Sequence, residues 1–343
     1  MDSIPENIRS DLRQFNLFPK ELVFKNDRKG RYNIIGVNDS ESYFVKINDP
    51  SVSEEHTQKF RKELEFYKTT QRSQLHPNYV DSNTNIMVLE NLQAESLRYW
   101  IINYIENGST NNDVVSDNFM RFVANLQKTI ERLYFRSQVI PDSICEPNTR
   151  DVDENELFIS HISNNCSRLF TSGPMNTSRV RIEQKWGSLL RTGYIKLFRQ
   201  KLSTILSNTS YELDLEPVHS DLHQDNVLVS DENNVYIVDW ENCRYGFWIS
   251  DVAFLLATIF ALLRNYPNHY EKIDQAFSEI IIQYEKEAFP IFDWVRMSMK
   301  NAISTNRRFH HNPSHHQLIY GSGKVNTQMM SILPTLLHER VNI

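Results

Sequence analysis

The chain of 343 residues is 40% hydrophobic and 11% aromatic, and it carries a formal net charge of −6. This apolar content suffices for one large domain or for two lobes with a buried core. The negative charge argues against nucleic acid as the main partner, because phosphate backbones are bound by clusters of Lys and Arg. A neutral or cationic substrate fits the charge better.

Neither the cysteines nor the apolar runs indicate export or a membrane anchor. The three cysteines form no CxxC pair, so we expect no disulfide framework and no zinc site, and a cytoplasmic location. The N-terminus lacks the apolar stretch of a secretory signal. The most apolar run, Val252 to Leu263, is shorter than the roughly 20 residues that span a membrane. We expect this run to be a buried core helix.

The first 92 residues predict a small, strand-rich lobe. Three runs between Leu22 and Asn48, LVFKN, YNIIGVN and SYFVKIN, are separated by the turn-forming DRKG and NDSE and predict three antiparallel strands. Ser53 followed by acidic residues predicts the start of a helix. The run NIMVLENL, over 85–92, predicts a further strand that ends in a connector.

Helical patterns dominate the predicted second lobe, residues 93–343. In DNFMRFVANLQKTIERLYF the apolar residues follow the i, i+3, i+4, i+7 spacing of one buried face, and a second helix is expected from Trp186. Between Pro141 and Lys185 the chain is polar and shows little periodicity, which predicts an insertion or a long loop.

The segment Val218 to Asp251 carries the residues of a phosphoryl-transfer site. Two β-like runs, NVLV and VYIVDW, flank a turn at DENN and predict a hairpin. Phosphoryl transfer needs a carboxylate that accepts the proton of the attacking hydroxyl, and oxygen ligands for Mg²⁺. The spacing His219-x-Asp221-x₄-Asn226 matches a kinase catalytic loop, and Asp239 follows the next strand. Asp251, at the expected start of the next helix, is a third element in the same order, and the agreement of the three favours phosphoryl-transfer chemistry over ordinary turn and cap residues.

Here the sequence resembles the aminoglycoside phosphotransferase and choline kinase-like family, whose loop reads HGDLHxxN and whose metal segment reads IDW or IDF. This chain has HSDLHQDN and IVDWE. The resemblance implies that Asp221 is the catalytic base and that Asn226 and Asp239 hold Mg²⁺. It also implies that His219 is structural and that Asp251 braces the loop and caps the following helix.

The resemblance implies an α+β, bilobed, protein-kinase-like fold, with a small β-rich N-terminal lobe, a larger mostly helical C-terminal lobe and MgATP between them. Lys46 would bind the α- and β-phosphates, and Glu63, preferred over Glu65, would pair with it. Main-chain groups near Glu90 and Leu92 would contact adenine.

Two departures from the family pattern concern glycine. The phosphate-covering turn DRKGRYN contains only Gly30, and Ser220 stands where the family commonly has glycine. Other histidines are expected to be non-catalytic: His223 to pack near the metal segment, and the cluster FHHNPSHHQ to be a solvated segment rather than a metal site.

Three functions remain open at this point. The first is transfer of phosphate from ATP to a hydroxyl of a small molecule such as an amino alcohol, an aminoglycoside or a sugar-like metabolite. The second, suggested by the polar insertion, is a kinase of Ser or Thr in a peptide. The third is a pseudokinase that binds a partner, which the intact Asp221, Asn226 and Asp239 disfavour.

Overall fold

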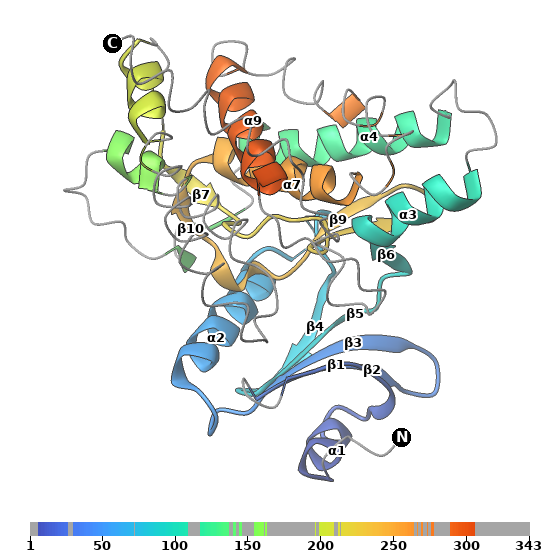
Figure 1. The fold of residues 1–343 in the computed structure, drawn as a ribbon. Helices are drawn as coiled ribbons and strands as arrows, with labels where there is room; N and C mark the ends of the chain where they lie inside the picture. The colour runs from blue at the N-terminus through green and yellow to red at the C-terminus, as the bar shows by residue number, and fades with distance from the viewer. Residues whose placement is uncertain are drawn as a thin grey trace, which may run out of the picture. The chain divides into compact units, whose positions relative to one another are not determined.

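The structure is a computed structural model (Figure 1). It describes residues 6–26, 30–71, 73–108, 117–136, 140–141, 144–145, 154–160, 199–208, 214–263 and 289–305, with the single residues 162, 196, 212, 266, 269, 273, 276 and 277. The predicted insertion and the His-rich cluster fall largely or wholly outside these residues. The helix predicted from Trp186 is described only in part, and residues 199–207 are helical.

Contacts divide the chain into two compact units. The first comprises Met1–Asn103, Ser116–Asn148 and Glu216–Tyr245, and the second comprises Tyr104–Val115, Thr149–Leu215 and Gly246–Ile343. The hairpin of the predicted catalytic segment therefore groups with the N-terminal strands. The functional lobe boundary near residue 92 stays a prediction.

A five-stranded antiparallel sheet forms the N-terminal part of the first unit. Its order is β1-β2-β3-β5-β4, and every neighbouring pair is antiparallel. The strands are β1 (Phe18–Asn26), β2 (Arg31–Val37), β3 (Ser42–Asn48), β4 (Tyr79–Ser82) and β5 (Ile86–Glu90). The three predicted strands and the later fourth are confirmed. The short, partly exposed β4 was not predicted, because it lacks an apolar alternation.

One face of this sheet packs with helix α1 (Glu6–Arg13) around an apolar cluster. Alternation in β2 and β3 directs Tyr32, Ile34, Val45 and Ile47 into this cluster, where they meet Leu12 of the helix. The opposite face is therefore left for the residues between them, among which is Lys46.

Helix α2 (Glu54–Thr69) begins where the sequence predicts. The Ser53 side chain accepts a hydrogen bond from the main-chain N–H of His56 at 3.3 Å, which satisfies one of the free donors of the first turn. The buried face of the helix carries Phe60, Leu64 and Phe66, and also the charged Glu63. A carboxylate on a buried face needs a cationic partner, and the structure provides one.

The predicted hairpin is confirmed in the same unit. β8 (Val227–Ser230) and β9 (Val235–Ile237) pair across the DENN turn, and β6 (Ala94–Ser96) completes a three-stranded sheet in the order β6-β8-β9. The 3-10 helix η3 (Trp240–Asn242) follows, and β7 (Glu216–Val218) pairs with β10 (Arg244–Gly246).

The periodic segment around residue 120 is helix α4 (Asp117–Glu131), continued by a π-helical turn, η1 (Arg132–Arg136). Its predicted face is buried as expected. The members of that face are Phe119, Phe122, Val123, Leu126, Ile130 and Leu133. Helix α3 (Leu97–Gly108) starts in the first unit and ends in the second.

The second unit contains helices α7 (Trp248–Leu263) and α9 (Phe289–Thr305), which pack together. Every residue of α7 is buried, which confirms the predicted core helix. Trp248 and Phe292 stack at 6.4 Å between ring centroids. No helix among the described residues is long and apolar enough to cross a bilayer. Among the described residues, the N-terminal part is rich in strands and the later part is mostly helical, which confirms the predicted α+β class.

Asp251 does not cap α7. The helix begins at Trp248, so Asp251 is its fourth residue and lies in the first turn, where a carboxylate interacts favourably with the helix dipole. The cap prediction was wrong because the apolar run that indicates this helix begins only after Asp251, whereas tertiary packing of Trp248 and Ile249 extends the helix backward.

Candidate active site

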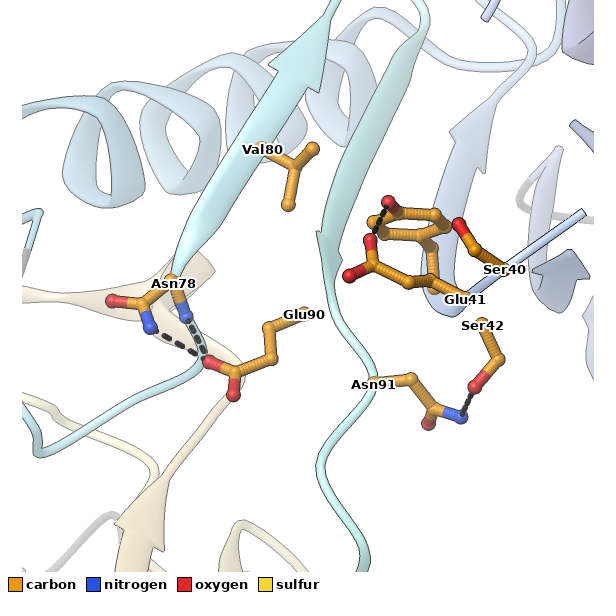
Figure 2. Close-up of a pocket in the computed structure, with 8 residues that line it drawn as sticks. Ser40, Glu41, Ser42, Asn78, Val80, Glu90 and Asn91 are labelled. Atoms are coloured by element: carbon orange, nitrogen blue, oxygen red, sulfur yellow. Dashed lines mark hydrogen bonds between the residues drawn. The ribbon is translucent and has the colours of Figure 1, made fainter. Parts of the chain in front are cut away.

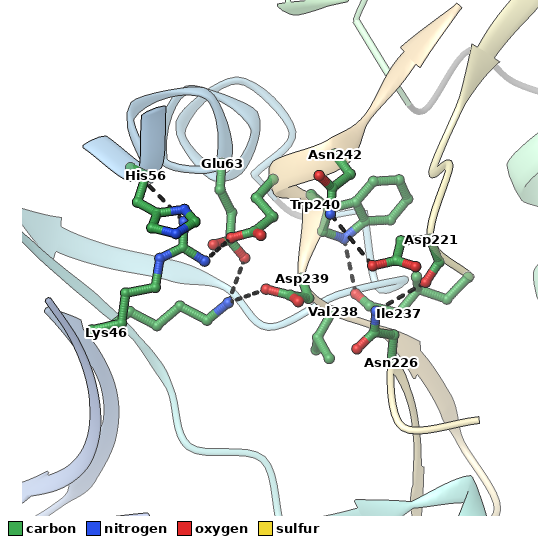
Figure 3. A network of polar contacts seen from close by, with 12 residues as sticks. Lys46, His56, Glu63, Asp221, Asn226, Ile237, Val238, Asp239, Trp240 and Asn242 are labelled. Carbon is green, nitrogen blue, oxygen red and sulfur yellow. Dashed lines mark hydrogen bonds and ion pairs between the residues drawn. The ribbon is translucent and has the colours of Figure 1, made fainter. Parts of the chain in front are cut away.

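Lys46 lies at the centre of a network of charged side chains (Figure 3). It sits in β3 opposite Asn33 of β2 and Met87 of β5. Its Nζ donates to Glu63 Oε1 at 2.7 Å and to Asp239 Oδ1 at 2.8 Å. The lysine, the helical glutamate and the aspartate of the predicted metal segment thus meet at one point.

The structure places Glu63, and not Glu65, beside this lysine. Glu63 is 1% exposed, whereas Glu65 is exposed and accepts a hydrogen bond from Thr69 one turn along α2. Side chains two residues apart on a helix point to different faces, so only one of the two can reach the buried lysine. Helical geometry resolves the ambiguity that the sequence leaves.

Burial and ion pairing shift the pKa values of these three groups. Burial raises the pKa of Glu63 to about 7, in spite of the opposing charge of Lys46. Burial would also raise the pKa of Asp239, but the charge and hydrogen bond of Lys46 outweigh it and lower the pKa to about 2. For Lys46, the charges of Asp239 and Glu63 outweigh burial and raise the pKa well above its ordinary value. At neutral pH the site therefore holds a charged lysine bound to a charged Asp239.

A strained backbone and a buried tryptophan hold Asp239 in place. Asp239 adopts a left-handed conformation with φ +70°, which Asp tolerates better than most residues, and it precedes η3. The next residue, Trp240, is fully buried and stacks on Phe66 of α2 at 4.1 Å between ring centroids. Trp240 Nε1 also donates to the carbonyl of Ile237 at 3.0 Å. Helix α2 therefore positions both carboxylates: it carries Glu63 itself, and it holds Asp239 through the stacking of Trp240 on Phe66.

His219 ties the predicted catalytic loop to this segment. Its Nδ1 accepts from the main-chain N–H of Asp221 at 3.3 Å, so Nε2 is the donor to the Val238 carbonyl at 2.9 Å. The ring also packs on Trp240 at 4.7 Å between centroids. Ser220 has φ +68°, the conformation that glycine adopts without steric cost, which accounts for the glycine that the family commonly has there.

Asp221 and Asn226 are held by hydrogen bonds within and beside the loop. Asn226 Nδ2 donates to the main-chain carbonyl of Asp221 at 3.0 Å, and Asn242 Nδ2 lies 3.4 Å from Asp221 Oδ2. The main-chain carbonyl of Asn226 accepts from Val238 N–H at 3.0 Å, which sets Asn226 beside the residue that precedes Asp239.

The donor chemistry of these side chains suits a magnesium ion. Carboxylate and amide oxygens are the ligands that Mg²⁺ prefers, and the nitrogen of Asn226 is already used, so its oxygen is the atom that remains. Glu63, Asp239 and Glu241 also offer carboxylate oxygens within 4.8 Å of one another. All three are ion-paired in this structure, to Lys46 or to Arg31.

Of the predicted adenine-binding residues, Glu90 is the last residue of β5 and Leu92 lies two residues beyond it. The N–H of Glu90 donates to the Asn78 carbonyl at 2.9 Å, and the Glu90 carboxylate accepts from the Asn78 side chain at 2.8 Å (Figure 2). The main-chain carbonyl of Glu90 and the N–H of Leu92 are therefore the better candidates for contacts to a base.

An open pocket of about 500 Å³ lies against the Glu90 side chain. Ser42, Tyr43 and Asn91 contribute to its wall, and Asn91 donates to Ser42 Oγ at 2.9 Å. The Lys46 network does not line this pocket.

Two ion pairs near the site were not predicted from the sequence. Arg31 pairs with Glu241, and Arg98 pairs with Asp225, the residue before Asn226. The partners are 210 and 127 residues apart in the chain, so no local spacing reveals them. The only available signal was position: Glu241 stands two residues after Asp239, and Arg31 directly follows Gly30.

A family model described as the phosphotransferase enzyme family matches residues 179–295. This range includes the predicted catalytic loop, the metal segment and Asp251. The match confirms the predicted family resemblance and the predicted enzyme class, a phosphotransferase. A search of curated proteins finds no match.

Solved structures that resemble the chain include three enzymes that are named after small-molecule substrates. Choline kinase LicA from Streptococcus pneumoniae is 15% identical, with TM-score 0.45, and the alignment covers 87% of this chain and 90% of that one. An ethanolamine kinase from Plasmodium vivax is 12% identical, with TM-score 0.49 and coverages of 89% and 77%. Spectinomycin phosphotransferase in complex with ADP and spectinomycin is 14% identical, with TM-score 0.45 and 93% coverage of both chains. Likenesses this weak assign no role to any residue.

Proposed function

We propose that the protein is an ATP- and Mg²⁺-dependent phosphotransferase that moves the γ-phosphate to a hydroxyl of a small molecule. The observation that carries this proposal is the position of Lys46 between Glu63 and Asp239, in a chain whose Asp221 and Asn226 lie on a loop bonded to the same segment. The family match over residues 179–295 supports the same chemistry.

Each side chain has a role that its contacts favour. Lys46 would bind the α- and β-phosphates of ATP, and Glu63 would hold the lysine in position. Asp239 and Asn226 would hold Mg²⁺, which when bound neutralises phosphate charge. Glu90 and Leu92 would contact adenine through main-chain atoms.

Asp221 is the proposed base. Its carboxylate would accept the proton of the attacking hydroxyl, and Asn242 lies close enough to orient one of its oxygens. His219 has both ring nitrogens engaged, with Asp221 N–H and Val238 carbonyl, which suits a structural role. For His223, burial lowers the pKa against the opposing charge of Asp221, and its Nδ1 accepts from Asp225 N–H, which favours a packing role too.

The acceptor is proposed to be an amino alcohol, an aminoglycoside or a sugar-like molecule. The net charge of −6 favours a cationic or neutral acceptor. The alternative, a kinase of Ser or Thr in a peptide, rests on residues 141–185, most of which lie outside the described residues. The proposed base and metal ligands are equally suited to either acceptor.

The test follows phosphate transfer from ATP with Mg²⁺ in wild type and in Asp221→Asn. Panels of amino alcohols, aminoglycosides, sugars and Ser-containing peptides serve as acceptors. We expect turnover with one small-molecule class that the variant loses while it still binds ATP. Turnover with peptides alone would support the peptide-kinase alternative in place of the small-molecule acceptor. A folded protein that binds no nucleotide would refute the proposal that it is an ATP-dependent enzyme.

A further inference from the structure

Arg31 occupies the first position of β2, directly after Gly30. Asn33, two residues later, lies opposite Lys46 in the register. Side chains two residues apart on a strand share a face, so Arg31 projects from the same face of the sheet as Lys46, while Tyr32 projects into the apolar cluster on the other face. Arg31 is therefore a second cation on the proposed nucleotide face. It lies two residues nearer to the start of β2 than Asn33, the residue opposite Lys46.

The single glycine of that turn is explained by packing rather than by a phosphate. Gly30 has φ +64°, and a Cβ at this position would lie 2.9 Å from the Asp49 carbonyl oxygen and 3.0 Å from Val52 Cβ. Asp49 N–H also donates to the Gly30 carbonyl at 2.7 Å. The contact with Asp49 and Val52 therefore accounts for Gly30, and the sequence of the turn has no second glycine for a glycine-rich phosphate loop.

The side chain of Arg31 is held by two partners, but not all of its hydrogen-bond donors are used. One Nη pairs with the Glu241 carboxylate, and the other donates to the His56 carbonyl at 3.3 Å. The Nε atom is buried and has no hydrogen-bond partner among the described residues. The Arg31 side chain is 17% exposed and that of Glu241 is 12% exposed, so this pair does not lie on the open surface.

Glu241 belongs to the same carboxylate group as the proposed metal ligand. Its oxygen lies within 4.8 Å of oxygens of Glu63 and Asp239. When all three are ionised, they carry three negative charges against the two positive charges of Lys46 and Arg31. In the structure Arg31 is thus the cation that balances Glu241.

We infer that Arg31 is a phosphate-binding residue of this site, paired with Glu241 when no nucleotide is present and transferred to the nucleotide phosphates when it binds. A phosphate group carries more charge than one carboxylate and offers acceptors to Nε as well as to Nη, so it is the better partner for a guanidinium. Glu241 then acts as a positioning residue that keeps Arg31 at the site. This inference rests on the proposed function.

The test measures binding of ATP, ADP and adenosine by titration calorimetry in EDTA, so that neither turnover nor metal enters the result. We expect Arg31→Gln to weaken ATP and ADP about 10- to 100-fold, as loss of a charge-assisted bond does, and to leave adenosine unchanged. Glu241→Gln removes the competing carboxylate, so ATP should bind about two- to fivefold more tightly. The double variant should behave as Arg31→Gln.

Controls separate this inference from a structural ion pair. Lys59→Gln removes a positive charge from the Lys59–Glu55 pair on α2, outside the network, and should leave ATP binding unchanged. Arg31→Lys keeps the charge and should bind ATP between wild type and Arg31→Gln, which guards against misfolding of the latter. Thermal unfolding of every variant checks the fold.

The outcomes are distinct. Equal weakening of ATP by Arg31→Gln and Glu241→Gln, with matching losses in thermal stability, would show a purely structural pair and overturn the inference. If Arg31→Gln binds ATP as tightly as wild type does, the inference is overturned and the proposed function stays intact. A folded wild type that binds no nucleotide would overturn both.

Discussion

Glu63 makes the stability of the protein depend on pH in an unusual direction. Most carboxyl groups in folded proteins lose protons more readily than in the unfolded chain, but burial raises the pKa of Glu63 from 4.5 to about 7. Between these two pH values the folded state holds a proton that the unfolded state has released. Stability therefore falls as pH rises from about 4.5 to about 7.

The size of the effect follows from the same values. A pKa rise from 4.5 to about 7 corresponds to about 3 kcal/mol of unfolding free energy, at about 1.4 kcal/mol for each pH unit. Glu63 is 1% exposed, so solvent screens this term little. Glu63→Gln keeps the shape and a hydrogen-bond acceptor for Lys46 but cannot ionise, so this part of the pH dependence should vanish.

Urea denaturation of wild type and Glu63→Gln at pH 5, 6, 7 and 8 measures the difference. We expect the stability of wild type relative to the variant to fall by up to about 3 kcal/mol between pH 5 and pH 8. Glu65→Gln, on the exposed face of the same helix, is the matched control and should follow wild type throughout. Parallel curves for wild type and Glu63→Gln would refute the argument that burial of this carboxyl dominates its pKa.

Three further predictions concern chemistry and folding. Asp221→Asn should lower kcat by about 10²- to 10⁴-fold, since a general base is lost, while ATP affinity measured by calorimetry stays within a few fold; an unchanged kcat would exclude Asp221 as the base. Trp240→Ala should lower the free energy of unfolding in urea by about 3–5 kcal/mol, because it empties the site stacked on Phe66; a loss below about 1 kcal/mol would contradict that packing role. Gly30→Ala should cost about 1–3 kcal/mol in the same assay, because of its positive φ and the approach to Asp49; full stability would mean that the turn relaxes freely.

Local patterns in the amino-acid sequence determined much of the fold by themselves. The alternation of SYFVKIN predicted β3, Ser53 predicted the start of α2, and the DENN turn predicted the β8–β9 hairpin, because strand period, capping and turn chemistry act between residues close in the chain. The motif around Asp221 and Asp239 likewise predicted the enzyme class, since its residue types and spacing are set by the reaction.

Tertiary structure alone decided which side chains meet. The sequence favours Glu63 over Glu65 as the partner of Lys46 without excluding Glu65, and the packing of α2 on η3 decides for Glu63. The Arg31–Glu241 pair joins residues 210 apart, and Asp251 lies within the first turn of α7 because packing extended the helix. These outcomes depend on burial and on contacts between distant segments, and the energies of such contacts do not exist until the chain is folded.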